Sequence, residues 1–148
     1  MMAIAMLAAA MPVPALATGQ QTFAAQCSMC HQPNGAGLPG SFPRLAGRVP
    51  VIAGSTGGRR YLAMVLLYGL YGPITVDGKR ISGLMPSMAS LSDQAIADVL
   101  NHAMALEKAA RKIAPFTAAE IAAVRGAGKT GTDVAAERAR LAGLKLIP

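Results

Sequence analysis

The chain has 148 residues, a length typical of one domain, and 53% of them are apolar. Aromatic residues make up only 4%, with no tryptophan, so an aliphatic core would be thin and a large, flat group inside would help to fill it. The net charge of +7 comes from basic residues scattered in ones and twos without interleaved aromatics. This distribution argues against nucleic-acid binding and is compatible with simple solubility or with an acidic partner.

Residues 1–17 have the features of a secretory signal peptide. An apolar run over 4–11 is followed by prolines and by the A-x-A sequence Ala15-Leu16-Ala17. No Lys or Arg precedes the run, so either the true start codon lies upstream or the amino group alone supplies the positive charge. The run is far shorter than the roughly 20 residues that a membrane span needs. We therefore expect export, cleavage after Ala17 and a mature chain without a membrane span.

The mature chain is predicted to begin with a short helix over residues 20–30, which brings Cys27 and Cys30 onto one face. A loop rich in Gly and Pro then runs over 32–58. Loops of this length are uncommon in a compact domain unless they have a task, and wrapping a ligand would be such a task.

The middle of the chain predicts a buried helix and a small hairpin. Residues 59–70 are apolar on almost every side, as in a buried helix. Gly69 or Gly72 would end this helix. Alternating apolar residues over 74–81 flank the turn sequence Asp77-Gly78, which indicates a small hairpin loop that leads to the sequence GLMPSM.

The C-terminal part is predicted to be helical throughout. Ser92 is a good N-cap for a helix with a regular apolar stripe. Thr117 and Glu120 form a capping-box pattern for the next helix, which stops at Gly126, and a last helix covers about 132–142. The predicted fold class is all-α, ending in a two-helix extension.

Both cysteines of the chain lie in Cys27-Ser28-Met29-Cys30-His31, which is the C-x-x-C-H pattern of c-type haem attachment. On a helix, thiols three residues apart share a face, and each can form a thioether with one vinyl group of the same porphyrin. The adjacent imidazole is then held beneath the iron as an axial ligand. Covalent attachment also keeps the cofactor from being lost after export.

Three other interpretations of the two cysteines are weaker. Redox dithiols of the C-x-x-C type occur near a βαβ pattern, and this sequence has none. A zinc site needs four ligands, and the sequence has no second Cys or His pair. A disulfide between residues three apart would close a very small loop and stabilise little.

The second axial ligand must come from elsewhere, and the candidates are the 9 methionines and His102. Met85 is favoured because it precedes a proline and therefore lies in an extended segment that can present its sulfur. Met88 is its local rival. Met64 is expected to pack in the core, Met29 to point away between the cysteines, and His102 to be a structural residue near an apolar stripe.

The sequences CSMCHQPNGAGLPGSFPRLAGR, LLYGLYGPITVDGKRISGLMPSM and LSDQAIADVLNHAM span about 19–106 and resemble the class I c-type cytochromes. These are single-haem electron carriers of the bacterial periplasm. The resemblance implies a cytochrome c fold wrapped around one covalent haem c, with the Met of the MP pair, Met85, as distal ligand. It also implies that the carbonyl of Pro43 accepts a hydrogen bond from His31. We expect a haem domain over 18–112 and a helical extension over 113–148.

The expected function is electron transfer by a periplasmic carrier, not an enzyme, between a dehydrogenase and an oxidase or another carrier. The segments GPITVDGK and FTAAEIAAVR resemble a subgroup often found as subunits or partners of such dehydrogenases and oxidases. Two axial ligands would leave the iron no open site, and a net charge of +7 would favour an acidic docking patch on the partner. The alternative is a haem-based catalyst or gas-binding sensor with a labile distal ligand.

Two details depart from the family or stay open at this stage. Family members often carry an aromatic residue where Asn101-His102 falls, packed against the first helix. Arg44 and Arg48 lie within reach of a haem propionate in principle, but for each we expect a solvated loop arginine.

Overall fold

The computed structural model describes residues 18–148, so the signal peptide expected over 1–17 lies outside the described residues. In chain order the elements are α1 (Gly19–Gln26), α2 (Ser28–His31), α3 (Arg48–Ile52), α4 (Thr56–Tyr68), β1 (Leu70–Val76), β2 (Lys79–Met85), α5 (Asp93–Ala105), α6 (Ala118–Arg125) and α7 (Gly131–Gly143). No helix in this part of the chain is long and apolar enough to cross a membrane.

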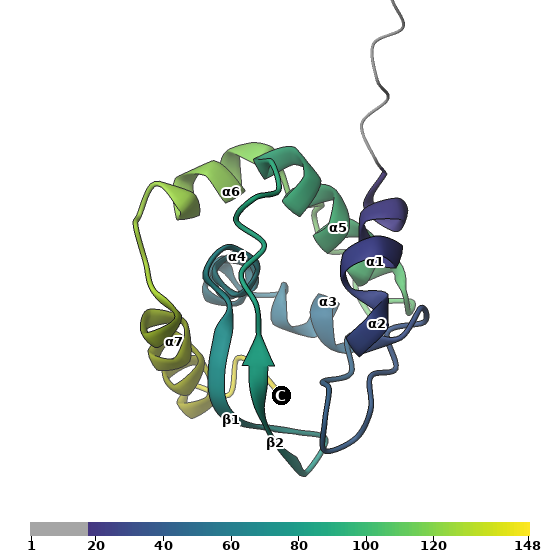
Figure 1. Ribbon diagram of the computed structural model, residues 1–148, viewed down its shortest axis with the longest axis vertical. Coiled ribbons are helices and arrows are strands. Elements are labelled where there is room, and N and C mark those ends of the chain that lie inside the picture. Colours follow the sequence, from purple (N-terminus) through teal and green to yellow (C-terminus); the bar gives the residue numbers. More distant parts are fainter. Residues whose placement is uncertain (1–17) are drawn as a thin grey trace, which may run out of the picture.

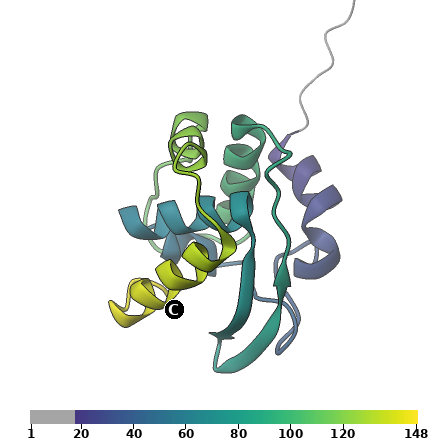
Figure 2. The ribbon, with the colours of Figure 1, turned by 60° about the vertical axis from the view of Figure 1, so that its left-hand side comes forward.

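The helices gather around α4. Helix α1 packs against α5, α6 packs against α5 and α4, and α7 packs against α4 and β1. The antiparallel hairpin of β1 and β2 lies between α7 on one side and α1 with α2 on the other, as both views show (Figure 1, Figure 2). The hairpin therefore separates the C-terminal helix from the segment that carries the two cysteines.

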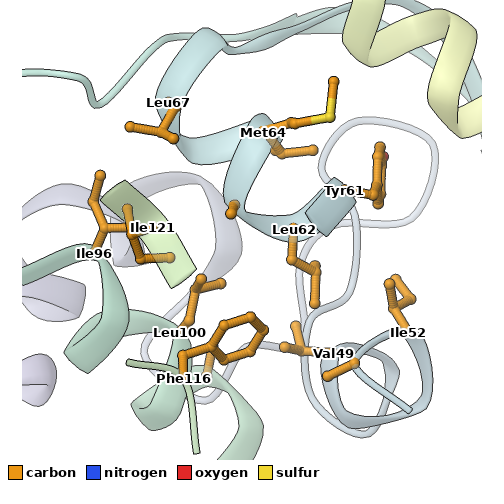
Figure 3. Close-up of a cluster of buried hydrophobic side chains, with 14 of the residues drawn as sticks. Val49, Ile52, Tyr61, Leu62, Met64, Leu67, Ile96, Leu100, Phe116 and Ile121 are labelled. Atoms are coloured by element: carbon orange, nitrogen blue, oxygen red, sulfur yellow. The ribbon is translucent and has the colours of Figure 1, made fainter. Parts of the chain in front are cut away.

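One hydrophobic core joins these elements. Side chains of α4 meet those of α5, α6 and the segment before α6 in its centre (Figure 3). The large side chains that are fully buried come from five helices, and they are Phe23, Leu67, Ile96, Ile121, Val134 and Leu141. Burying a side chain of this size stabilises a fold by about 1.5–3 kcal/mol. Residues on both sides of position 112 thus contribute to the same core.

The prediction of an all-α fold is wrong in one place, because the hairpin is a two-stranded sheet. Its strands pair over their whole length, with Leu70 opposite Met85. Asp77 and Gly78 make the turn with φ of 49° and 73°, the left-handed conformations that a two-residue hairpin turn requires. The turn sequence indicates the hairpin but not its length, because two glycines and a proline interrupt the alternating pattern of a strand.

Two other boundaries differ from the prediction. The first helix is divided at Cys27 into α1 and α2, and the long loop contains the short helix α3. The N-cap of α3 is Gly47, which has no side chain to accept a capping hydrogen bond. Pro50 lies in the first turn, where a missing N–H costs little. A helix without a capping residue and with a proline gives no sequence signal.

Helix starts follow the capping residues. The Ser92 hydroxyl accepts a hydrogen bond from the N–H of Ala95 (3.1 Å) at the start of α5, as predicted. Thr117 and Glu120 form the reciprocal capping box of α6. Such caps satisfy N–H groups that have no partner inside the helix.

The crossing of α1 and α5 is close. Gly19 lies directly against the backbone of Asp98, where a Cβ would clash. The ring of His102 packs on Phe23 with centroids 5.1 Å apart and planes tilted by 58°. The imidazole thus supplies the ring contact that the family makes with an aromatic residue at this crossing, and His102 is a packing residue.

Candidate functional site

An apolar cavity lies between the 27–43 segment and the hairpin. The hollow measures about 760 Å³ when the open solvent at its mouth is included. Cys27, Cys30, His31 and Pro43 line one side. The other side consists of hairpin residues and the start of the following segment, including Leu70, Ile74, Ile81, Leu84, Met85, Pro86 and Met88. The five site residues predicted from the sequence all line this one cavity: Cys27, Cys30, His31, Pro43 and Met85.

His31 has a fixed orientation in the cavity wall. Its residue is only 7% exposed, and its Nδ1 lies 2.9 Å from the carbonyl oxygen of Pro43. Because a carbonyl can only accept, Nδ1 carries the proton and donates it, which leaves a lone pair on Nε2. Burial lowers the pKa of His31, and the bond to Pro43 opposes this in part. A neutral imidazole held in this way is suited to bind a metal through Nε2.

The loop after His31 is folded back so that Pro43 reaches the imidazole. The N–H of Gly37 donates to the carbonyl of His31 (2.9 Å), and the N–H of Leu38 donates to the carbonyl of Phe42 (2.9 Å). Gly37 has a φ of 67° and lies against the backbone of Phe42 and Pro43, where a Cβ would clash. The glycine therefore allows both the turn and the close approach.

The two cysteines are free and half-buried. Burial, and next the nearby Cys30, raises the pKa of the Cys27 thiol. The described residues contain no group of three or more His, Cys, Asp or Glu side chains that could hold a metal ion. The geometry therefore supports neither a disulfide nor a zinc site in this part of the chain.

Two methionines line the hairpin side of the cavity, Met85 at the end of β2 and Met88 in the segment that follows. Met64 is buried in the core, and His102 packs between α1 and α5. Met29 is 90% exposed. Of the five side chains considered individually as distal ligands, only Met85 and Met88 line the cavity.

The two arginines of the loop have different surroundings. Arg44 donates to the Asp77 carboxylate through Nε (2.9 Å) and Nη2 (3.0 Å), and through Nη1 to the carbonyl of Ala46. The Arg44 guanidinium holds the pKa of Asp77 below its usual value. This partly exposed ion pair joins the loop after Pro43 to the turn of the hairpin.

Arg48 is buried, and the expectation of a solvated side chain is wrong for it. The residue is 4% exposed, and its Nη1 and Nη2 have no hydrogen-bond partner among residues 18–148. Burial, and next the positive charge of Arg138, lowers the pKa of Arg48. The charge of Asp77 acts on Arg48 in the opposite direction but does not bond to it. A buried cation without hydrogen-bond partners is unfavourable, so a further acceptor at this position would stabilise it.

Comparison with known proteins agrees with this site. The family model described as cytochrome c matches residues 16–107. Two curated relatives, both named cytochrome c-552 and both from Thermus thermophilus, are each 50% identical over 124 residues. These matches cover 82% of this chain and 94% and 83% of the relatives. The chain belongs to the cytochrome c family. As a class I c-type cytochrome, it is an electron carrier with covalently bound haem c and not an enzyme.

The residues of this cytochrome fit a haem. The cavity is apolar, it carries two thiols three residues apart, and it has a buried imidazole on one side and two methionines on the other. Arg48 does not line the cavity, but its Nη1 and Nη2 have no hydrogen-bond partner among the described residues, and a haem propionate that reached them would accept those bonds. A large planar cofactor also accounts for a core that contains few aromatic side chains.

Sequence reasoning missed one wall of the cavity and the burial of an arginine outside the cavity lining. The apolar wall formed by Ile74 and Ile81 is the inward face of the hairpin, and alternation around Asp77-Gly78 could have identified it. The burial of Arg48 has no local signal, because a charged residue in a Gly-rich loop is usually exposed.

Proposed function

We propose that this cytochrome is an exported, periplasmic carrier of single electrons whose haem is attached to Cys27 and Cys30 and ligated by His31 and Met85. The observation that supports the proposal is that all four side chains line one apolar cavity, with His31 contributed by α2 and Met85 by the end of β2. Bound there, the haem supplies a one-electron iron couple.

The protein side chains determine what this couple does. His31 is held by Pro43 in one tautomer and orientation, so its Nε2 needs no rearrangement to bind. With Met85 in the sixth position, no site stays open for oxygen or peroxide, which favours electron transfer over catalysis. A thioether ligand and apolar walls both raise the reduction potential relative to two imidazoles in a polar site.

Met85 is favoured over Met88 by its backbone. Met85 is the last residue of β2 and is paired with Leu70, so its Cα is fixed by a ladder of hydrogen bonds. Met88 lies outside the strands, and its backbone makes one bond to the carbonyl of Leu66 (2.7 Å) and accepts one from the N–H of Leu91 (3.0 Å). A ligand at the end of a paired strand would have the more rigid backbone of the two.

The proposal includes the division of the chain and its partners. Residues 1–17 would direct export, residues 18–112 would hold the haem, and residues 113–148 would form an extension packed on the shared core. The net charge of +7 favours a redox partner with an acidic docking patch, such as a dehydrogenase or an oxidase complex. The rate of electron exchange with such a partner should fall as salt is added.

The test is an absorption spectrum of the purified oxidised protein. His and Met ligation predicts the weak charge-transfer band between iron and sulfur, and slow binding of CO to the reduced form. If the band is missing and CO binds readily, the distal position is open. The protein would then be a gas-binding or catalytic haem protein.

A further inference from the structure

The segment 86–92, which joins Met85 to α5, has neither helix nor strand. Most of its residues are exposed, so core packing alone does not fix it. Ordering each residue of such a segment costs about 1–2 kcal/mol of backbone entropy. Met85 is held on its N-terminal side by the pairing of β2 and on its C-terminal side by this segment, which two sets of contacts keep in place.

The first half of the segment is held by the end of α4. The Ser87 hydroxyl donates to the carbonyl of Leu67 (2.6 Å), and the N–H of Met88 donates to the carbonyl of Leu66 (2.7 Å). Carbonyls in the last turn of a helix have no partner within the helix. The segment therefore satisfies them while it becomes ordered.

The second half is held by one side chain of α6. Arg125 donates through Nη1 to the carbonyl of Ala89 (2.8 Å), through Nη2 to the carbonyl of Leu91 (2.8 Å) and through Nε to the carboxylate of Asp93 (2.8 Å). The planar, rigid guanidinium is suited to binding several acceptors at once, and such charge-assisted bonds are stronger than neutral ones. Three anchor points within five residues leave this half of the segment little freedom.

Arg125 is itself fixed to the same end of α4. The Tyr68 hydroxyl lies 2.8 Å from the carbonyl of Val124 and 3.0 Å from that of Arg125, the two residues that end α6. Tyr68 is the last residue of α4, next to the two residues that hold the first half of the segment. The end of α4, segment 86–92 and the end of α6 thus form one closed unit, and Figure 1 shows the segment passing beside both helices.

We propose that Arg125 is a positioning residue for Met85, so that residues 113–148 act on the haem site through the distal-ligand segment. The proposal rests on the proposed ligation by Met85. Without the three bonds of Arg125, the second half of the segment can open locally while the core stays folded. With a haem bound, Met85 would then be held less firmly as a ligand, and another ligand such as CO would bind more readily.

Arg59 provides a matched control, because it fastens the other end of the same helix. It binds the Glu120 carboxylate (2.8 and 2.9 Å) and the carbonyls of Ala114 and Pro115, and its guanidinium lies 4.1 Å from the centre of the Phe116 ring. None of these partners lies in segment 86–92. If Arg125 only attached α6 to the rest of the protein, replacing Arg125 would have the same effects as replacing Arg59.

The experiment uses the full-length holoprotein as wild type, Arg125→Gln and Arg59→Gln. Three quantities are followed in each: loss of the iron–sulfur band on heating, global unfolding by circular dichroism, and the rate of CO binding to the reduced form. In Arg125→Gln we expect band loss well before global unfolding and CO binding at least about tenfold faster, as loss of charge-assisted hydrogen bonds would give. In Arg59→Gln the two transitions should keep their wild-type separation, even if both occur at lower temperature.

A second readout does not depend on the iron. Hydrogen exchange at the N–H of Leu91, which bonds to the carbonyl of Met88, should be about tenfold faster in Arg125→Gln. Exchange in α1 and at the N–H of Met88, which the carbonyl of Leu66 holds, should change much less. If Arg125→Gln does not fold, Arg125→Lys keeps the charge but not the three-way geometry and should show the same changes.

Equal behaviour of the Arg125 and Arg59 variants, with the band present in wild type, would overturn this proposal alone. A wild-type protein without the band would overturn the proposed ligation and this proposal with it.

Discussion

The two walls of the cavity are held in different ways. The hydrogen bonds of His31 itself are close in sequence, the longest being the bond to Pro43 twelve residues away, although the Arg44–Asp77 pair also joins the loop after Pro43 to the hairpin turn. The wall with Met85 is fixed from a distance: Ser87 bonds to α4 twenty residues earlier, and Ala89 bonds to Arg125 thirty-six residues later. A short motif can therefore specify the proximal wall, whereas the distal wall depends on the whole fold. Substitutions in the two walls should therefore change different properties of the protein.

The largest effect is expected on the proximal wall. If Cys27 and Cys30 attach the haem as proposed, replacing both by alanine would remove both thioether bonds, and denatured protein should carry no haem at all. A denaturing acid gel stained for haem iron measures this directly. Ser28→Ala, which removes only a hydroxyl bonded to the carbonyl of Ala24, should give a stained band like wild type. A stained band from the double variant would contradict the attachment.

Arg48 is buried, and its Nη1 and Nη2 have no hydrogen-bond partner among the described residues, so its replacement tests whether an anionic group of the haem pairs with it. A buried cation favours reduced over oxidised iron, so Arg48→Met should lower the reduction potential, by on the order of 50 mV. Spectroelectrochemical titration measures the shift. Arg44→Met removes a cation already paired with Asp77 at the surface and should shift the potential much less. Equal shifts for the two variants would disprove a specific role for Arg48.

Glu137 anchors α7, which covers the hairpin behind the distal wall. Its carboxylate is 8% exposed and binds Arg140 and Arg60, which lower its pKa from 4.5 to about 2. Because the folded pKa lies below the unfolded one, this stabilisation is present above pH 4.5 and is lost as the pH falls through about 2. We expect about 1–2 kcal/mol at neutral pH, since both arginines are half-exposed.

Denaturant unfolding of wild type and Glu137→Gln at several pH values checks this. The wild type should be more stable at pH 7, and the difference should shrink toward zero near pH 2. Glu107→Gln, which replaces an exposed carboxylate, should change stability by less than about 0.5 kcal/mol. A difference for Glu137→Gln that is independent of pH would show that the ion pairs do not stabilise α7.

The smallest effect is expected where segment 86–92 enters α5. Ser92→Ala removes the N-cap hydroxyl and should lower the free energy of unfolding by about 1 kcal/mol. Ser90→Ala, in the same exposed turn, should stay within about 0.5 kcal/mol of wild type. Equal losses in the two variants would mean that the cap does not hold this end of the distal wall.

The features that could be predicted from the sequence are those that depend on residues close together in the chain. The spacing of Cys27, Cys30 and His31 implies their relative placement because it lies within one helical turn. Capping residues such as Ser92 predict where a helix begins, because they bond to residues close to them in the sequence. The full length of the hairpin, the burial of Arg48 and the bonds of Arg125 depend on residues far away in the chain, and such contacts leave no local pattern. The choice between Met85 and Met88 lies between these cases, because both are near one proline but only one ends a paired strand.

The reduction potentials of Met85→Ala and Met88→Ala test the central claim most directly. If Met85 is the distal ligand, Met85→Ala should lower the potential by more than about 60 mV, the equivalent of a tenfold change in a one-electron equilibrium, and abolish the iron–sulfur band. Met88→Ala should keep the band and stay near the wild-type potential. The reverse pattern would mean that Met88 is the distal ligand of the iron, and it would contradict the arrangement of the distal wall described above.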